Sequence, residues 1–522
     1  MQRYGTWLAA TIILLTGIFV LKALPDPRDY RTGADEGTYY RQAETLVREG
    51  TGGFERIARD FALSPSLQEY PNPLRVGTIS VAAMALNVDD SYRSLSFVSL
   101  FSFLILLIGA WRFVDHFWGR EHALATLLLL AASPLALAMS RRALMDSLAY
   151  TTAAFSVFSF FYLVERGTRR SLAIFVVTFA FAILVKETAV LLLPFYLVAL
   201  VYLKIAKQLK LDWPSVLIAL VLPPIIVGIA YVSAYGVDGL TGILNGLHGA
   251  FSGDYTKRFQ QGPWYRYFVD FLMLSPFTLL LAIAYAGYLF GTGYRRWNFL
   301  LFAFAVFLPC AFAFLPKSAR YVLLLDLPIR LFAASMLLAL PQYFAQATLD
   351  SRIGKSLSTQ PSMTKFLSWL PALILGLLVV TDVAAFQRYF IVESIYDPVS
   401  YNFLRVNRIV PDAAEIPLPG IGIGLSTARA QVLQRPDAEG FLQLGYEYCA
   451  AGMHLECSWA SRESLRLSGD NATAYNNLCT AYNGMHDWQN AIAACGEALR
   501  LKPDFQLARN NLVWAQAHAA EH

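Results

Sequence analysis

The sequence predicts an all-α membrane protein: a polytopic bundle of about 11 transmembrane helices, followed by a small C-terminal α-solenoid. Of the 522 residues, 56% are apolar and 15% carry charge, against roughly 45–50% and 25% in soluble domains. Apolar stretches long enough to cross a bilayer recur from residue 6 to residue 385. The composition excludes intrinsic disorder and a small disulfide-framed secreted fold. The formal charge of +5 is too mild and too dispersed for a nucleic-acid partner.

Each predicted span is a stretch of about 20 apolar residues bounded by charges, Trp or Tyr. The first lacks a small-x-small cleavage site before Pro25, so we expect a retained anchor instead of a signal peptide. The fifth and sixth are separated by little more than Lys186 and Glu187; one broken helix is the alternative, and it would reverse the orientation of everything downstream. The spans lie near 6–24, 95–114, 121–139, 144–164, 170–185, 188–203, 214–236, 266–291, 297–315, 320–340 and 366–385.

Lys and Arg in the short loops set the predicted orientation, because such loops stay on the cytoplasmic side. With a cytoplasmic N-terminus, the cations fall in alternate loops, which favours eleven spans over ten. The outer side then receives residues 25–94, a loop near 236–265 and the region after about 386. The inner-loop cations are Arg166, Arg169, Arg170, Lys204, Lys207, Lys210, Arg295, Arg296, Arg352, Lys355 and Lys365.

The first outer loop carries its own secondary structure signals. An amphipathic helix is predicted from Glu36 to Arg48, a break at the glycines Gly50, Gly52 and Gly53, and a second helix after Pro73. We expect this loop to lie on the membrane as a lid or site wall.

The C-terminal region repeats with a period of 34, over residues 438–471 and 472–505, and a third partial helix over 505–517 would cap the stack. The repeated positions are those of tetratricopeptide repeats. We therefore expect a transmembrane domain over 1–385, a linker over 386–437 and a tetratricopeptide domain over 438–522. The matching residues are Tyr475, Leu478, Tyr482, Ala491, Ala498 and Pro503 in the second unit, and Phe441, Leu444, Gly445, Tyr448 and, more weakly, Cys457 in the first.

Four of the five cysteines lie in these repeats. In each unit the two fall at the same level of an antiparallel helix pair, so disulfides Cys449–Cys457 and Cys479–Cys495 are geometrically plausible in an oxidising compartment. The alternative is that they are small buried residues at core positions. Cys310, alone in a span, is expected to serve packing.

Charged residues near the span ends fall on one predicted side of the membrane. Ionisable groups at membrane depth are expensive and tend to be functional. Their convergence predicts a site at the outer membrane boundary. The clusters are Asp35 and Glu36; Arg141, Arg142 and Asp146; Lys186 and Glu187; and Lys317 and Arg320.

The order of these motifs resembles the GT-C glycosyltransferases over roughly residues 6–340, particularly the branch of protein O-mannosyltransferases and lipid A aminoarabinose transferases. That resemblance implies a GT-C-like fold and a sugar taken from a polyprenyl-phosphate carrier on the non-cytoplasmic face. Thr38 and Asn72 stand where the aminoarabinose transferases carry basic residues, which puts lipid A as acceptor in doubt. The motifs are Asp35-Glu36-Gly37-Thr38-Tyr39, Tyr70-Pro71-Asn72-Pro73-Leu74-Arg75, Ser133-Pro134, Ser140-Arg141-Arg142-Ala143-Leu144-Met145-Asp146, Val185-Lys186-Glu187-Thr188, Pro316-Lys317 and Arg320-Tyr321.

The chemistry of such a transfer assigns roles to these residues. An acceptor hydroxyl must lose its proton as it attacks the anomeric carbon, which makes Asp35 the candidate general base. One displacement inverts that centre. The departing lipid phosphate needs positive charge and no second acid. Phosphate-binding candidates are Arg75, Arg141, Arg142, Lys186, Lys317 and Arg320; Glu36 and Asp146 would orient basic groups or a metal, and Tyr39, Glu187 and Tyr321 would support the site.

Each of these motifs also has a structural interpretation. Asp35 with Glu36 would be an acidic helix start, and Arg141 with Arg142 interface anchors. Lys186 with Glu187 would form a turn between spans, and Lys317 with Arg320 would be snorkelling side chains.

Signatures of soluble catalytic domains are missing from the sequence. It has no Walker loop and no paired Cys-x-x-Cys site. A divalent cation, Mg²⁺ or Mn²⁺, would fit at Asp35 and Glu36. The acceptor is left open as a lipid, a glycan or a protein, and the repeats would suit a protein partner.

Two other functions compete with the glycosyltransferase. An O-antigen ligase or polymerase also combines many spans with a large outer loop, but the large loop here is the first one and the Asp-Glu motif would go unexplained. A transporter or an envelope scaffold is the non-enzymatic alternative, although the charges lie at helix ends and no inverted repeat is visible. We expect a bacterial inner membrane protein with its site and C-terminal domain in the periplasm; an endoplasmic reticulum location would obey the same physics.

Overall fold

A computed structural model describes the chain as two compact units. One comprises Met1–Tyr30 and Thr38–Val410, the other Arg31–Gly37 and Pro411–His522. Of the residues named above, Tyr70, Arg295, Arg352 and Lys355 and the side chain of Lys365 lie outside the described part. The structure describes residues 2–519 except 28–29, 31–33, 65–66, 69–70, 253–259, 261, 293–295, 314, 351–360, 393–398, 433–434 and, within 401–430, all but 404, 407, 425, 428 and 429.

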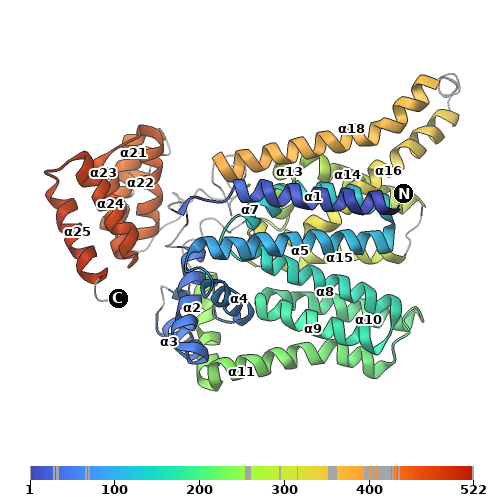
Figure 1. The fold of residues 1–522 in the computed structure, drawn as a ribbon, viewed down its shortest axis with the longest axis horizontal. Coiled ribbons are helices and arrows are strands. Elements are labelled where there is room, and N and C mark those ends of the chain that lie inside the picture. The colour runs from blue at the N-terminus through green and yellow to red at the C-terminus, as the bar shows by residue number, and fades with distance from the viewer. Residues whose placement is uncertain are drawn as a thin grey trace. The chain divides into compact units, whose positions relative to one another are not determined.

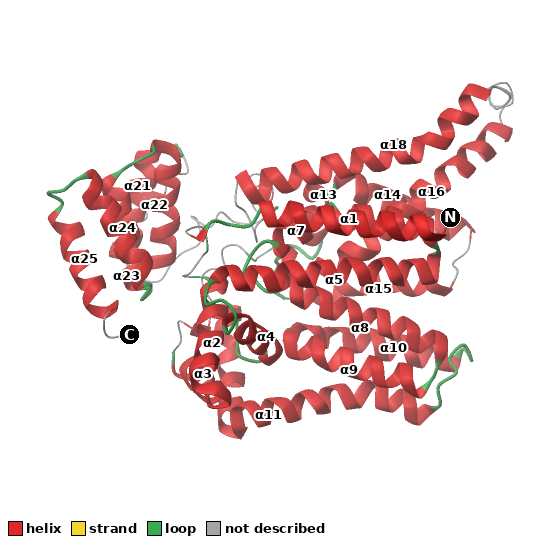
Figure 2. Cartoon of the chain, viewed as in Figure 1, coloured by secondary structure: helices red, strands yellow, loops and turns green. Residues whose placement is uncertain are grey.

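The predicted all-α fold of an integral membrane protein is confirmed, since the described residues form helices and no strand (Figure 2). Among them, seven helices are long and apolar enough to cross a membrane, and nine if each of two bent pairs counts as one span. The seven spans are Tyr4–Lys22, Tyr92–Trp118, Asp146–Arg166, Glu187–Ile205, Trp213–Leu247, Ala319–Pro341 and Trp369–Val392.

The two bent pairs are the predicted spans near 121–139 and 266–291. Helix α6 (Arg120–Ala131) meets α7 (Pro134–Ser140) at 61°, and α13 (Arg266–Leu274) meets α14 (Pro276–Thr292) at 119°. Both second helices begin with a proline, which lacks the N–H that a continuing helix would need.

The two remaining predicted spans form helices shorter than the roughly 20 residues of a full span. Helix α9 (Arg169–Val185) and helix α15 (Arg296–Phe312) each have 17 residues, at the lower limit for crossing the hydrocarbon core. Eleven predicted spans thus correspond to eleven helical segments, of which nine at most have the length and composition of a span.

The first outer loop contains the two predicted helices and one that the sequence did not suggest. Helix α2 (Asp35–Glu49) and helix α4 (Val76–Leu86) match the prediction, but the glycine segment forms a short 3-10 turn, η2 (Gly50–Gly52), and opens α3 (Gly53–Leu63). Helix α3 is strongly amphipathic, and its buried face includes Phe54, Ile57 and Phe61.

Helix α11 (Trp213–Ser252) corrects the expected loop near 236–265, because helix continues to Ser252 past a kink at Gly236. Gly236 has a φ of 67°, a conformation that glycine adopts without strain. Beyond the kink, Gly239 and Gly242 let α11 approach α3 closely, since a Cβ at Gly242 would lie 2.9 Å from the Cβ of Ala62.

Helix α8 (Asp146–Arg166) shows how the body of the first unit is polarised. Its 21 residues separate Asp146 from Arg166 by about 30 Å, close to the hydrocarbon thickness. Packed beside α8 are α9 and α5 (Tyr92–Trp118). The remaining helices of this unit, drawn in Figure 1, are α1 (Gln2–Lys22), η4 (Glu187–Leu192), α10 (Leu193–Ile205), η5 (Ala319–Leu325), α16 (Asp326–Asp350), α18 (Pro361–Phe386) and the π-helical η6 (Gln387–Val392).

The C-terminal unit is a stack of helical hairpins that starts at the predicted repeat boundaries. Of the two alternatives for these cysteines, the structure shows the disulfides, Cys449–Cys457 joining the first hairpin and Cys479–Cys495 the second. Gly445 lets the first two helices pack closely, because a Cβ there would lie 2.7 Å from the Ser461 hydroxyl. The helices are α21 (Ala438–Ala450), α22 (His454–Ser468), α23 (Ala472–Gly484), α24 (Trp488–Leu501) and the single α25 (Gln506–Ala519).

Candidate functional site

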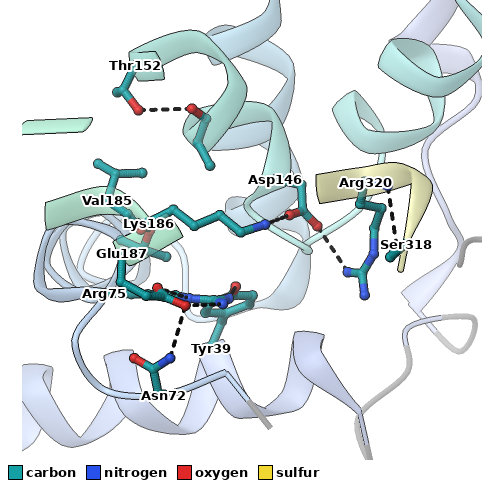
Figure 3. Close-up of polar contacts among 12 residues, drawn as sticks. Tyr39, Asn72, Arg75, Asp146, Thr152, Val185, Lys186, Glu187, Ser318 and Arg320 are labelled. Carbon is teal, nitrogen blue, oxygen red and sulfur yellow. Dashed lines mark hydrogen bonds and ion pairs between the residues drawn. The ribbon is translucent and has the colours of Figure 1, made fainter. Parts of the chain in front are cut away.

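Asp146 is held between two cations that come from distant parts of the chain. The Nζ of Lys186 donates to its Oδ1 at 2.6 Å, and Nη1 of Arg320 donates to its Oδ2 at 3.0 Å (Figure 3). All three residues are buried. Burial of ions is tolerated where opposite charges and hydrogen bonds satisfy them, as they do here.

Local backbone structure places these three residues. Met145 adopts a left-handed conformation with a φ of 59°, and the chain then enters α8 with Asp146 as its first residue. A carboxylate there is favoured by the helix dipole. Lys186 is extended between the end of α9 and the start of η4, and the hydroxyl of Ser318 caps the segment that carries Arg320.

A second ion pair lies directly beside the first. Arg75, immediately before α4, donates to the Glu187 carboxylate from Nε at 2.9 Å and from Nη2 at 3.0 Å. The amide of Asn72 donates to the same carboxylate at 3.0 Å, and Arg75 also donates to the hydroxyl of Tyr39. Because Lys186 points to Asp146 and Glu187 points to Arg75, two adjacent residues join the two pairs into one network (Figure 3).

This network, defined as Arg75, Asp146, Lys186, Glu187 and Arg320, holds three cations and two carboxylates. It therefore carries one net positive charge. Burial lowers the pKa of Arg75, but the neighbouring Glu187 carboxylate more than offsets this and keeps that pKa well above its ordinary value. The guanidinium stays charged at every physiological pH.

A cavity of about 50 Å³ adjoins the network and is ionic at one end and apolar elsewhere. Asp146, Lys186 and Arg320 supply its charged wall, and the ring of Tyr321 lies beneath Lys186, with its centroid 5.2 Å from Nζ. Such a lining suits a ligand with an anionic group attached to a hydrocarbon chain. The apolar wall consists of Ala149, Ala153, Ala189, Leu192, Leu308, Phe312, Leu323 and Leu324, with Tyr150 and Thr188 also lining the cavity.

Three of the predicted phosphate-binding residues lie outside the network. Arg141 donates from Nε to the carbonyl of Ala23 and from Nη1 to that of Phe390 at 3.3 Å. Arg142 is buried with its guanidinium 5.9 Å from the centre of the Tyr30 ring. Lys317 donates to the carbonyl of Leu315 at 3.4 Å.

Asp35 and Glu36 form the first turn of α2. Glu36 is fully buried and Asp35 is half-buried. Tyr39 lies one helical turn after Asp35 on the same face of α2.

A divalent cation would need several carboxylate, imidazole or thiolate ligands close together. No group of three His, Cys, Asp or Glu side chains with the geometry of a metal site occurs among them. In the network, both carboxylates are engaged by cations, so they are poor ligands as they stand. We therefore assign no step of the chemistry to a metal.

Sequence reasoning missed a second buried charge cluster. Arg330 donates to Asp326 at 2.8 Å, to Asp382 at 2.6 Å and to the hydroxyl of Ser275 at 3.2 Å, tying α16, α18 and the α13–α14 break together. Asp326 and Arg330 stand four residues apart within an apolar span, and that spacing was the available signal. Asn72, whose amide donates to the Glu187 carboxylate, stands out in the sequence only as a departure from the pattern of the aminoarabinose transferases.

Residues 76–231, less than a third of the chain, match the family of dolichyl-phosphate-mannose-protein mannosyltransferases. The matched part includes Asp146, Lys186 and Glu187. Arg75 directly precedes it, and Arg320 lies well beyond its end. The match points to a membrane glycosyltransferase of the GT-C type. A comparison with curated proteins gives no match.

Proposed function

We propose that this protein transfers a sugar from a polyprenyl-phosphate carrier to an acceptor on the non-cytoplasmic side of the membrane. The observation that carries the proposal is the buried five-residue network, whose three cations and two carboxylates leave one net positive charge beside a largely apolar cavity. A polyprenyl phosphate has the complementary chemistry, an anionic group on a long hydrocarbon.

In this mechanism the cations stabilise the leaving phosphate. Lys186 and Arg320 share one carboxylate, so they can turn part of their hydrogen bonding toward a phosphate without leaving Asp146 unpaired. Charge on the departing oxygen grows in the transition state, and preorganised cations in a water-poor site stabilise it strongly. Glu187 holds Arg75 in place, and Asn72 in turn donates to the Glu187 carboxylate.

Asp35 is the proposed general base. It stands one turn before Tyr39, the α2 residue bonded to Arg75, at the start of a helix in the outer loop. Its carboxylate would take the proton of the acceptor hydroxyl as that oxygen attacks the anomeric carbon. A single displacement of this kind inverts the anomeric configuration, and the phosphate leaves as its anion.

The orientation and the C-terminal unit complete the proposal. Arg166, Arg169 and Lys204 lie at the opposite ends of their helices from the network, which makes that end cytoplasmic under the positive-inside rule. Disulfides in the C-terminal unit fit an oxidising periplasm. We further propose that this unit is a tetratricopeptide domain that recruits the acceptor or an assembly partner.

Binding of a short polyprenyl phosphate tests the proposal without knowledge of the sugar or acceptor. Farnesyl phosphate would be titrated into the purified full-length protein and its occupancy measured by native mass spectrometry, with farnesol as the uncharged probe. Lys186→Gln should weaken binding about tenfold or more, the scale of a lost charge-assisted hydrogen bond. The control Arg93→Gln removes an exposed cation elsewhere on the same unit. Equal binding of farnesol, or equal losses in both variants, would contradict the proposal.

A further inference from the structure

A second pocket lies at the end of the helices opposite the network. It has a volume of about 290 Å³ and is bounded by the end of α10, the segment after it, and the start of α15. Its lining residues are Tyr202, Leu203, Gln208, Arg296, Phe299 and Leu300.

Arg296 gives this pocket a positive charge that no carboxylate neutralises among the described residues. Its Nη2 donates to two backbone carbonyls, those of Val164 at 3.1 Å and Gln208 at 3.0 Å. Glu165, a nearby acid, is already engaged by His116 at 2.9 Å and by Arg166 at 3.8 Å. The carbonyls fix the guanidinium in place but leave its charge available to an anion.

The lining of the pocket combines the polar groups of Gln208 and Arg296 with two aromatic and two leucine side chains. The rings of Tyr202 and Phe299 lie 6.3 Å apart and are 54% and 41% exposed, while Leu203 and Leu300 close the floor. In a membrane protein, exposed aromatic side chains at a helix end lie at the level of the lipid head groups. A ligand that fills this pocket therefore combines an anionic group with hydrocarbon.

The surrounding loops concentrate further positive charge. Lys207, just after the end of α10, adopts a left-handed conformation with a φ of 57°, which glycine usually adopts at this position. The N–H of Gln208 donates to the carbonyl of Leu203 and closes the turn. Asp212, the acid of this segment, is occupied with capping α11 through the N–H of Ser215. The exposed cations among the described residues of these loops and adjoining helix ends include Arg166, Arg169, Arg170, Lys207 and Lys210.

We propose that this pocket binds the head group of an anionic phospholipid, with the phosphate at Arg296 and the upper acyl chains against Tyr202 and Phe299. Basic pockets between transmembrane helices on the cytoplasmic side are suited to such head groups. The bound lipid would join α8, α15 and the segment after α10, which already meet at the Arg296 guanidinium. The site is separate from the proposed donor site at the other end of α8.

Native mass spectrometry of the full-length protein with added phosphatidylglycerol or phosphatidylcholine tests this site. We expect retention of phosphatidylglycerol over phosphatidylcholine, and a loss of about fivefold or more in Arg296→Gln. Arg170→Gln is the matched control, because it removes one exposed cation at the same end without touching the pocket. Equal losses in the two variants would overturn the proposal in favour of diffuse surface charge.

Two further arms keep the proposal falsifiable if Arg296→Gln perturbs folding. Tyr202→Ala and Phe299→Ala retain the charge but remove the walls, and each should weaken phosphatidylglycerol retention with the thermal unfolding temperature of the lipid-free protein unchanged. Inorganic phosphate at millimolar concentration should not displace the lipid. Displacement by phosphate, or full retention in both wall variants, would show an ion site and refute a lipid site.

Discussion

Arg75 and Glu187 are 112 residues apart in sequence, yet the guanidinium binds the carboxylate through two nitrogens, at 2.9 and 3.0 Å. The pair joins the outer loop to the break between α9 and η4. Since Lys186 directly precedes Glu187 in the chain, the pair also fixes the segment from which Lys186 reaches Asp146. The geometry of the proposed phosphate-binding cations thus depends on a contact with the outer loop.

Glu187→Gln should destabilise the protein by ~3–5 kcal/mol, because it leaves the buried Arg75 guanidinium without its carboxylate. Thermal unfolding in detergent measures this. The charge swap Arg75→Glu with Glu187→Arg should recover part of the lost stability, since it restores the pair in reverse. A double variant no more stable than Glu187→Gln would show that the pair itself is not what holds the segment.

Asp146→Asn should lower stability by a similar ~3–5 kcal/mol, because Lys186 and Arg320 lose their shared anion. A phosphate-bearing ligand would replace that anion. Farnesyl phosphate should therefore raise the unfolding temperature of the variant more than that of the wild type. The exposed pair Glu44–Arg48 provides the control, and Glu44→Gln should cost ~1 kcal/mol or less. An equal ligand effect on variant and wild type would argue against phosphate binding at these cations.

Lys317 should confer an alkaline limit on donor binding if it contacts the donor phosphate. Burial lowers the pKa of Lys317, and the positive charge of Arg266 lowers it further. Its charge is therefore lost at a pH below that of an ordinary lysine, and the KM for donor should rise as the pH passes through this lowered pKa. Lys317→Arg stays charged and should abolish the rise. Identical alkaline limbs in wild type and variant would remove Lys317 from the donor site.

Thiol counting tests the oxidising environment of the C-terminal unit. Alkylation of the denatured, unreduced protein should modify Cys310 alone, and all five cysteines should react after reduction. Replacing Cys479 and Cys495 by Ser should destabilise the unit by ~2–4 kcal/mol, the usual effect of removing such a cross-link. Four or five reactive thiols before reduction would place this unit in a reducing compartment.

The sequence alone predicted the helical segments and most members of the network, because charged residues at the ends of apolar segments are rare and alternating spans assign them to a side. Lys186, Arg320 and Asp146 came from that reasoning. Their pairing did not, since it depends on the extended backbone at Lys186 and on the rotation of each helix about its axis. Arg141 shows that closeness in sequence does not predict a contact. It lies shortly before Asp146 in the chain, but it donates to the carbonyls of Ala23 and Phe390.

Contacts between segments that are distant in the chain could not be predicted from the sequence either. The residues Asp326 and Arg330 are visible as an i, i+4 pair in an apolar span, but Asp382 as their third member requires the packing of α18 against α16. The sequence did not predict helix α3, because its glycine-rich start is typical of a break. In the structure, glycines of α11 let that helix pack closely against α3, a contact that the sequence does not reveal.

The most direct test of the central claim is the content of polyprenyl-phosphate-linked sugars in cells that carry the wild type or Asp35→Asn, measured by mass spectrometry at equal protein levels. Asp60→Asn, an exposed carboxylate of the same outer loop, is the control. A transferase that uses Asp35 as its base predicts that a lipid-linked sugar accumulates only in Asp35→Asn, while the glycan that receives the sugar loses it. An unchanged lipid profile together with an intact glycan would contradict the account.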